Sequence, residues 1–165
     1  MKLSNLIVGA LAMTLLIGCE PQDRRPGTWT AGEIVEEKVA DWSFSNADLE
    51  VFIQTSPWYG IPHSVTTVLA TSNQKLYVPS IYSDPITPFP EGKYWNRIIA
   101  DNPEVLVKIS GKRYPRRVVQ VTDAEEFETG FLALAKKYPF WQQQYDNPED
   151  RVTFYVLRLD DPQAD

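Results

Sequence analysis

The chain has 165 residues, of which 43% are hydrophobic and 12% aromatic, and its formal net charge is −6. This size and composition indicate one globular domain, which excludes a two-domain enzyme and disorder over the whole length. The negative charge disfavours a nucleic-acid partner. Because the chain has one cysteine and one histidine, intrachain disulfides and zinc sites of the cysteine-rich or paired-histidine kind are also excluded.

The first 18 residues have the pattern of a bacterial signal peptide. Lys2 precedes an apolar run over 6–17, which is shorter than the roughly 20 residues of a membrane span. The run ends in Leu16-Ile17-Gly18-Cys19, which resembles the lipobox of bacterial lipoproteins. We therefore predict a membrane anchor on acylated Cys19 in the cell envelope, outside the cytoplasm, with the outer membrane favoured over the inner. The alternative is an ordinary apolar segment whose cysteine is accidental.

Residues 19–32 mix charge, proline and glycine without apolar periodicity, which predicts a flexible tether before a domain over 33–165. Apolar residues recur between acidic ones at the start of this domain, and their spacing predicts a short amphipathic helix over 34–42. Alternation of apolar and polar residues then predicts a strand over 49–54.

Residues 56–81 have a pattern typical of a β-hairpin. Residues 56–62 hold two prolines and a glycine and predict a turn that leads into a strand over 64–71, which is rich in valine and threonine. Residues 72–74 predict a tight connection to a partner strand over 75–81. The three prolines within 82–92 predict a loop.

A helix is predicted over 93–101, because apolar residues follow helical spacing there and the chain then reaches Asn102-Pro103. Strands are predicted over 105–110 and 113–121. The second carries Pro115, which is typical of an edge strand.

Thr122 and Glu125 fit a capping box, with Thr122 as the capping hydroxyl, that opens a helix ending before Pro139. A last strand is predicted over 152–159. The resulting order is helix, three strands, helix, two strands, helix, strand. It predicts an α+β domain built as a six-stranded antiparallel split β-barrel with flanking helices.

From Gly60 to Pro162 the chain resembles the deazaflavin-dependent nitroreductase family of the flavin-binding split-barrel group. The motifs that carry the resemblance are Gly60-x-Pro62, Leu76-Tyr77-Val78-x-Ser80, Trp95-x-x-x-Ile99-x-x-Asn102-Pro103 and Tyr138-Pro139-x-Trp141. The resemblance implies an oxidoreductase that holds a planar cofactor, 8-hydroxy-5-deazaflavin or FMN, in a groove of the barrel for hydride transfer. It also implies a homodimer.

The resemblance places Ser80 and Trp95 on the cofactor side of that groove. His63, Ser83 and Asn96 join them as candidate cofactor-binding residues. For His63, the only histidine of the chain, the alternative is an exposed loop residue. The sequence assigns no metal ligand and no catalytic residue.

Tyr138 and Trp141 fall on the segment that covers the ring in the family. With Tyr145 they offer aromatic faces on which a planar substrate could stack. The alternative is that these three side chains pack the last helix against the barrel. The acidic residues Asp123, Glu125, Glu126 and Glu128 fit helix capping and compensation of the helix dipole.

The phosphate-binding parts of the family pattern are weak in this chain. Thr55-Ser56-Pro57-Trp58-Tyr59 stands where relatives carry several basic residues, and Ser80-Ile81-Tyr82-Ser83 replaces a glycine-rich turn. This favours an alternative function, a non-catalytic ligand-binding or envelope-interaction lipoprotein that has lost the cofactor. A run of five basic residues over 108–117 either binds an anion or lipid head groups, or protects a hairpin edge against pairing.

Overall fold

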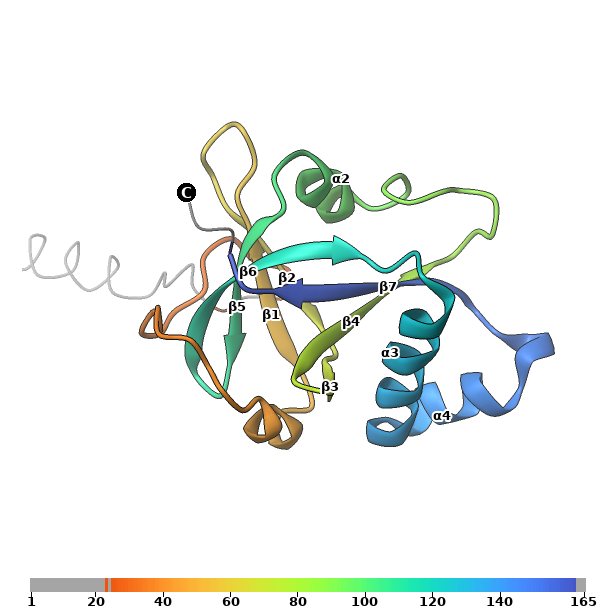
Figure 1. The fold of residues 1–165 in the computed structure, drawn as a ribbon. Helices are drawn as coiled ribbons and strands as arrows, with labels where there is room; N and C mark the ends of the chain where they lie inside the picture. Colours follow the sequence, from red (N-terminus) through yellow and green to blue (C-terminus); the bar gives the residue numbers. More distant parts are fainter. Residues whose placement is uncertain (1–22, 24, 163–165) are drawn as a thin grey trace, which may run out of the picture.

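A computed structural model describes residue 23 and residues 25–162. The described residues form one antiparallel sheet of seven strands, in the order β2-β1-β5-β6-β7-β4-β3, which curls into a half-barrel (Figure 1). The strands are β1 (Val51–Thr55), β2 (His63–Thr67), β3 (Ala70–Ser72), β4 (Lys75–Tyr82), β5 (Glu104–Ile109), β6 (Lys112–Gln120) and β7 (Thr153–Asp160).

The prediction of six strands is wrong because the strand predicted over 64–71 divides in two. β2 pairs with β1 and β3 pairs with β4, so the chain changes partner at 68–69. The backbone groups of the buried Leu69 lie outside both ladders and bind side chains instead. The Tyr138 hydroxyl donates to the Leu69 carbonyl at 2.9 Å and accepts from its N–H at 3.2 Å. These bonds satisfy the backbone N–H and carbonyl of Leu69, which have no strand partner at the break between β2 and β3.

The other predicted strands are confirmed to within two residues at each end. β6 lies between β5 and β7, but β7 pairs only with its last part, Arg117–Gln120. Pro115 therefore lies in the part of β6 that pairs with β5 alone. The predicted edge position is correct for this part of the strand, although β6 as a whole lies between two strands.

The helices α2 (Tyr94–Asp101) and α3 (Ala124–Lys137) match their predicted positions. The cap of α3 differs, because the Asp123 carboxylate, and not the Thr122 hydroxyl, accepts the Glu126 N–H at 2.8 Å. A further helix, α4 (Pro139–Asp146), follows after one residue, with Pro139 in its first turn, where a missing N–H costs nothing. Short 3-10 turns, η1 (Ser43–Ala47) and η2 (Pro148–Asp150), complete the order.

The helix predicted over 34–42 is absent from the described residues. Ile34 bridges to Arg113 in extended form, and the Val35 N–H donates to the Arg113 carbonyl at 2.8 Å. Val35 and Val39 pack against the core beside the buried Trp42. The apolar spacing therefore reflects an irregular, non-helical segment, which packs on the core side chains that a helix would also bury.

The residues just before this segment also lie on the sheet, where the sequence predicts a flexible tether. Gly27 and Ser64 exchange two backbone hydrogen bonds of 3.2 and 2.8 Å. The Thr30 N–H and hydroxyl both donate to the Gln54 side chain, at 2.7 and 2.9 Å. These hydrogen bonds hold residues 25–35, called the strap below, against the strands. Cys19 and the predicted signal peptide lie outside the described residues.

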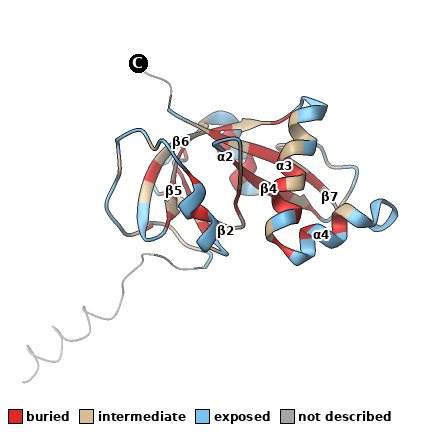
Figure 2. Cartoon of the chain, turned by 60° about the horizontal axis from the view of Figure 1, so that its bottom comes forward, coloured by how far each residue is buried: buried red, intermediate tan, exposed pale blue. Residues whose placement is uncertain are grey.

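The core consists of two hydrophobic clusters on opposite sides of the sheet. Side chains alternate along β4, so Leu76 and Val78 belong to the first cluster and Tyr77 belongs to the second. The second cluster lies between the sheet and helices α3 and α4, whose inner faces are buried (Figure 2). Within the described part of the chain, no helix combines the length and the apolar character that a membrane crossing requires.

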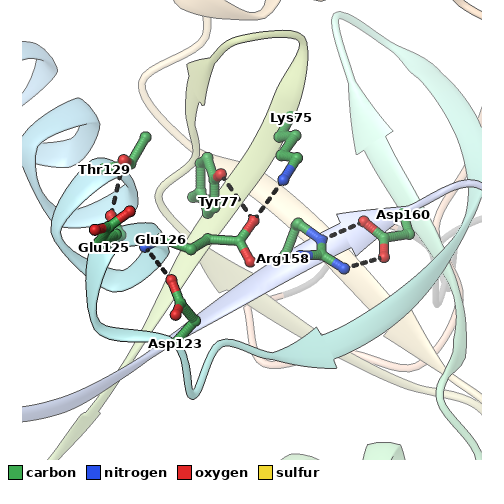
Figure 3. A network of polar contacts seen from close by, with 8 residues as sticks. All are labelled: Lys75, Tyr77, Asp123, Glu125, Glu126, Thr129, Arg158 and Asp160. Atoms are coloured by element: carbon green, nitrogen blue, oxygen red, sulfur yellow. Dashed lines mark hydrogen bonds and ion pairs between the residues drawn. The ribbon is translucent and has the colours of Figure 1, made fainter.

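A network of charges fixes α3 to the strands β4 and β7 (Figure 3). The Glu126 carboxylate accepts hydrogen bonds from Lys75 Nζ at 2.7 Å, Arg158 Nη1 at 2.6 Å and the Tyr77 hydroxyl at 3.3 Å. The hydrogen bonds from Lys75 and Arg158 lower the pKa of Glu126 to about 2. Burial, followed by the charge of Glu126, raises the pKa of Tyr77 to about 12.

Candidate functional site

Three of the predicted cofactor-binding residues lie inside the protein. Ser80 and Asn96 are fully buried, and Trp95 packs in the first core cluster. The Ser80 hydroxyl donates to Asn96 Oδ1 at 3.2 Å and accepts from Asn96 Nδ2 at 2.9 Å. Asn96 Nδ2 also donates to the Tyr82 hydroxyl at 2.6 Å. These groups satisfy one another, as buried polar groups must.

Ser83 lines a cavity of about 70 Å³ beside Tyr82 and Lys93. The buried Tyr82 ring meets the Tyr155 ring edge-on, with centroids 4.9 Å apart. Burial raises the pKa of Tyr82 and lowers the pKa of Lys93. Ligand pockets for molecules of cofactor size measure about 300–1,000 Å³. A cavity of about 70 Å³ is therefore too small to hold a flavin or deazaflavin ring.

The three aromatic residues predicted to bind a planar substrate all pack in or against the second core cluster. Trp141 is 2% exposed and meets the Phe154 ring at 4.8 Å. Tyr138 binds the backbone of Leu69, and burial raises the pKa of its hydroxyl. Tyr145 packs on the Phe131 ring at 5.1 Å and donates to Glu128 at 2.5 Å. The structure thus places these side chains apart from Trp95, in contacts that fix α3 and α4 to the sheet.

A larger cleft lies between α2 and the β1–β2 loop, residues 56–62, on one end of the half-barrel (Figure 1). It measures about 540 Å³, which is within the range of ligand pockets. The loop and the helix both contribute to its lining, which consists of Ser56, Pro57, Trp58, Tyr94, Arg97, Ile98, Asp101 and Asn102.

The loop that forms one wall of the cleft is held in place by polar contacts to α2 and the residue after it. The Tyr94 hydroxyl donates to the Tyr59 hydroxyl at 3.0 Å, and this hydrogen bond raises the pKa of Tyr59. Asn102 Nδ2 donates to the Ser56 carbonyl at 3.0 Å. The loop turns at Gly60, whose φ of +80° suits glycine. Trp58 is left 94% exposed.

His63 lies beside the cleft, at the start of β2. Its ring meets the Tyr94 ring edge-on, with centroids 5.1 Å apart. The ring of His63, a predicted site residue, therefore contacts a residue of the cleft lining. Sequence reasoning missed Trp58 and Tyr94 as site residues. The available signal was the aromatic pair Trp58-Tyr59 in a proline-bounded turn, where apolar side chains have no strand or helix face to cover.

The charges of the cleft suit a ligand of low charge. Arg97 lies over the Tyr94 ring, with its guanidinium carbon 5.6 Å from the centroid, and Asp101 follows one helical turn later. One cation and one acid give the lining no excess of positive charge. A doubly charged phosphate needs several convergent donors, and the described lining does not supply them.

The five basic residues of 108–117 all have partners within the chain. Lys108 pairs with Asp23 at 2.5 Å, Lys112 with Glu33 at 3.5 Å and Arg117 with Glu104 at 2.7 Å. Arg116 pairs with Asp161, and Arg113 Nε donates to the Gly32 carbonyl at 2.8 Å. This arrangement favours a structural role for the cluster over an anion site.

No family model and no curated protein matches the chain. Solved structures with a similar fold include an F420-H2-dependent reductase, FDR-A, with 20% identity over 68% of this chain and 94% of that chain, at a TM-score of 0.50. A protein of Bacteroides thetaiotaomicron assigned to 5-nitroimidazole resistance has 17% identity over 78% and 82% of the two chains, at 0.53. The heme storage protein HutZ of Vibrio cholerae has 12% identity over 73% and 87%, at 0.51.

These likenesses establish that the chain has the split-barrel fold. They agree with the curled antiparallel sheet expected from the sequence, with seven strands in place of six.

Proposed function

We propose that the chain is a non-catalytic split-barrel domain that binds a planar aromatic ligand of low charge in the cleft between the β1–β2 loop and α2. The observation that carries the proposal is the exposure of Trp58. This large aromatic side chain is 94% exposed, and it lies on a loop that hydrogen bonds hold in place beside a cleft of about 540 Å³. A ligand ring could therefore stack on it at low entropic cost. Tyr94 and His63 add aromatic surface next to it.

A second candidate function is that of a flavin- or deazaflavin-dependent oxidoreductase of the nitroreductase type. The likeness in fold to an F420-H2-dependent reductase favours it. Such a cofactor would supply the redox chemistry, and the protein would bind and orient it. The buried Ser80–Asn96 pair and the small cavity at Ser83 argue against this candidate at the family's groove.

The two candidates are separated by titrating the full chain, purified in detergent, with riboflavin and with FMN, followed by quenching of tryptophan fluorescence. The two ligands share one ring system, and only FMN carries a phosphate. We expect riboflavin to bind with equal or higher affinity than FMN. Tighter binding of FMN or of 8-hydroxy-5-deazaflavin by tenfold or more, with reduction of a nitroimidazole by the loaded protein, would establish the oxidoreductase instead. Hemin is added to the panel because HutZ stores heme.

Variants then locate the binding site. Tyr94→Ala removes an aromatic lining residue that is 44% exposed, and Phe140→Ala removes a ring of similar exposure, 46%, on α4. We expect only Tyr94→Ala to weaken binding of the planar ligand. Equal effects of both variants, or no saturable binding of any ligand in the panel, would refute a binding site in the cleft.

We also propose that Cys19 carries acyl chains that anchor the domain to the cell envelope. The support is the sequence Leu16-Ile17-Gly18-Cys19 after a short apolar run. Metabolic labelling with palmitate tests it, since Cys19→Ala should abolish the label, and a labelled variant would contradict the proposal. A homodimer stays a prediction, which light scattering of the purified chain tests. One protein of similar fold is described as a domain-swapped dimer.

A further inference from the structure

A second cavity of about 450 Å³ lies between α3, β3 and η1, at the end of the half-barrel opposite α2 (Figure 1). Its lining is mostly polar and carries two lysines, Lys136 and Lys137, from the last turn of α3. No residue of this lining is acidic. In a chain with a net charge of −6, a cavity with this composition is a local concentration of positive charge.

The ammonium group of Lys137 lacks a counter-ion among the described residues. It donates to the carbonyls of Ser45 and Leu69, both at 2.8 Å, which leaves one of its three donors unused. The charge of Asp48 acts on Lys137 without forming an ion pair with it, and the Asp48 carboxylate accepts from the Ser110 hydroxyl at 2.5 Å. Burial lowers the pKa of Lys137. A half-buried cation of this kind gains from an anion brought to it.

Other groups around the cavity also have free hydrogen-bonding capacity. The side chains of Asn46, Ser72 and Lys136 form no hydrogen bond or ion pair within the described part of the chain, although all three line the cavity. The hydroxyl of Thr129 is engaged with the Glu125 carbonyl at 2.9 Å, and that of Thr71 with Ser45 at 2.8 Å. The unengaged donors are thus the ammonium group of Lys136, one N–H of Lys137, the Asn46 amide and the Ser72 hydroxyl.

We propose that this cavity is a binding site for the phosphate group of a phosphate monoester. The charged donors would neutralise the phosphate, and the amide and hydroxyl would bind its remaining oxygens. The volume beyond the phosphate leaves room for a small organic group. This inference is independent of the proposed function, because the cavity and the α2 cleft share no lining residue.

Equilibrium dialysis of the full chain against radiolabelled inorganic phosphate tests the proposal. We expect one site per chain with a Kd on the order of 1 mM or tighter, as two charged hydrogen bonds allow. Lys136→Gln should weaken binding about tenfold, and Ser72→Ala by a smaller factor. Lys38→Gln, which removes the same charge from an exposed residue elsewhere, should leave it unchanged.

Competition by glycerol 3-phosphate and by dihexanoylphosphatidic acid then distinguishes a soluble ligand from a lipid head group, both of which carry the phosphate monoester. Absence of saturable phosphate binding up to 20 times the expected Kd would overturn the proposal. An equal loss of binding in Lys136→Gln and Lys38→Gln would also overturn it, because that result would reflect overall charge and not a site.

Discussion

The charge network at Glu126 makes a quantitative prediction about stability. The pKa of Glu126 falls from an ordinary value of 4.5 to about 2 because Lys75 and Arg158 bind its charged form. This change corresponds to roughly 3 kcal/mol in favour of the folded state at neutral pH. Since 19% of the side chain is exposed, solvent screening reduces the effect. We expect Glu126→Gln to lower the free energy of unfolding at pH 7 by about 1–3 kcal/mol.

The pH dependence of this contribution has a definite sign. The folded-state pKa lies below the unfolded-state pKa, so the stabilisation is complete above about pH 5 and is lost as the pH falls from about 4.5 to 2. Urea unfolding at pH 7, 5, 4 and 3, followed by circular dichroism, measures it. The wild type and Glu126→Gln should differ by nearly the same amount at pH 7 and pH 5, and the difference should shrink at pH 4 and further at pH 3.

Glu125→Gln is the matched control, because Glu125 precedes Glu126 on α3 and its side chain has no ion pair among the described residues (Figure 3). It should change the free energy of unfolding by less than about 0.5 kcal/mol at every pH. Equal destabilisation by the two variants, or a difference for Glu126→Gln that does not depend on pH, would refute the assignment of this stability to the charge network.

Three further substitutions test the packing and the cleft. Gly130→Ala should lower the free energy of unfolding by about 1–3 kcal/mol in urea titrations, because an added Cβ would lie 2.8 Å from Tyr77 Cδ1; an unchanged midpoint would show that α3 moves away freely. Asn96→Ala should cost about 1–3 kcal/mol by the same assay, since it leaves the Ser80 hydroxyl buried without a partner. Trp58→Ala should change stability by less than about 0.5 kcal/mol while abolishing binding of the planar ligand; retained binding would remove Trp58 from the site.

The strands were predictable from the sequence because local signals and tertiary contacts agree. Alternation and tight turns placed β1, β4, β5, β6 and β7 within two residues of their observed ends. The division between β2 and β3 was not predictable, because residues 64–71 have strand composition throughout. The strand is broken because the chain stops pairing with β1 and starts pairing with β4. The Tyr138 hydroxyl, which binds the backbone N–H and carbonyl of Leu69 at the break, is remote in sequence.

The helix predicted over 34–42 shows the opposite case. Val35, Val39 and Trp42 are spaced as on a helix face, but a non-helical segment can bury the same side chains when a sheet lies beneath it. The ladder of β6 offers free backbone groups at Arg113, and the segment pairs with them. Composition alone does not reveal that partner.

The candidate site was predictable in part. The resemblance directed attention to Ser80, and Asn96 was a further candidate beside it. The structure brings the two together, but as a buried pair that bind each other. The identity of a residue does not tell whether its hydrogen bonds go to a ligand or to a neighbour. The α2 cleft depends on how the loop over 56–62 docks on the helix, which is a tertiary property.

The strap has a mechanical consequence for a chain held by residues upstream of Asp23. Tension applied there would be carried first by the Asp23–Lys108 ion pair, then by the Gly27–Ser64 pair and the Thr30–Gln54 bonds. These attachments lie on different strands, so they would release one after another. The hydrogen bonds between the strands would therefore carry force only after the contacts of the strap had broken. Until then the strap would extend while the domain stayed folded.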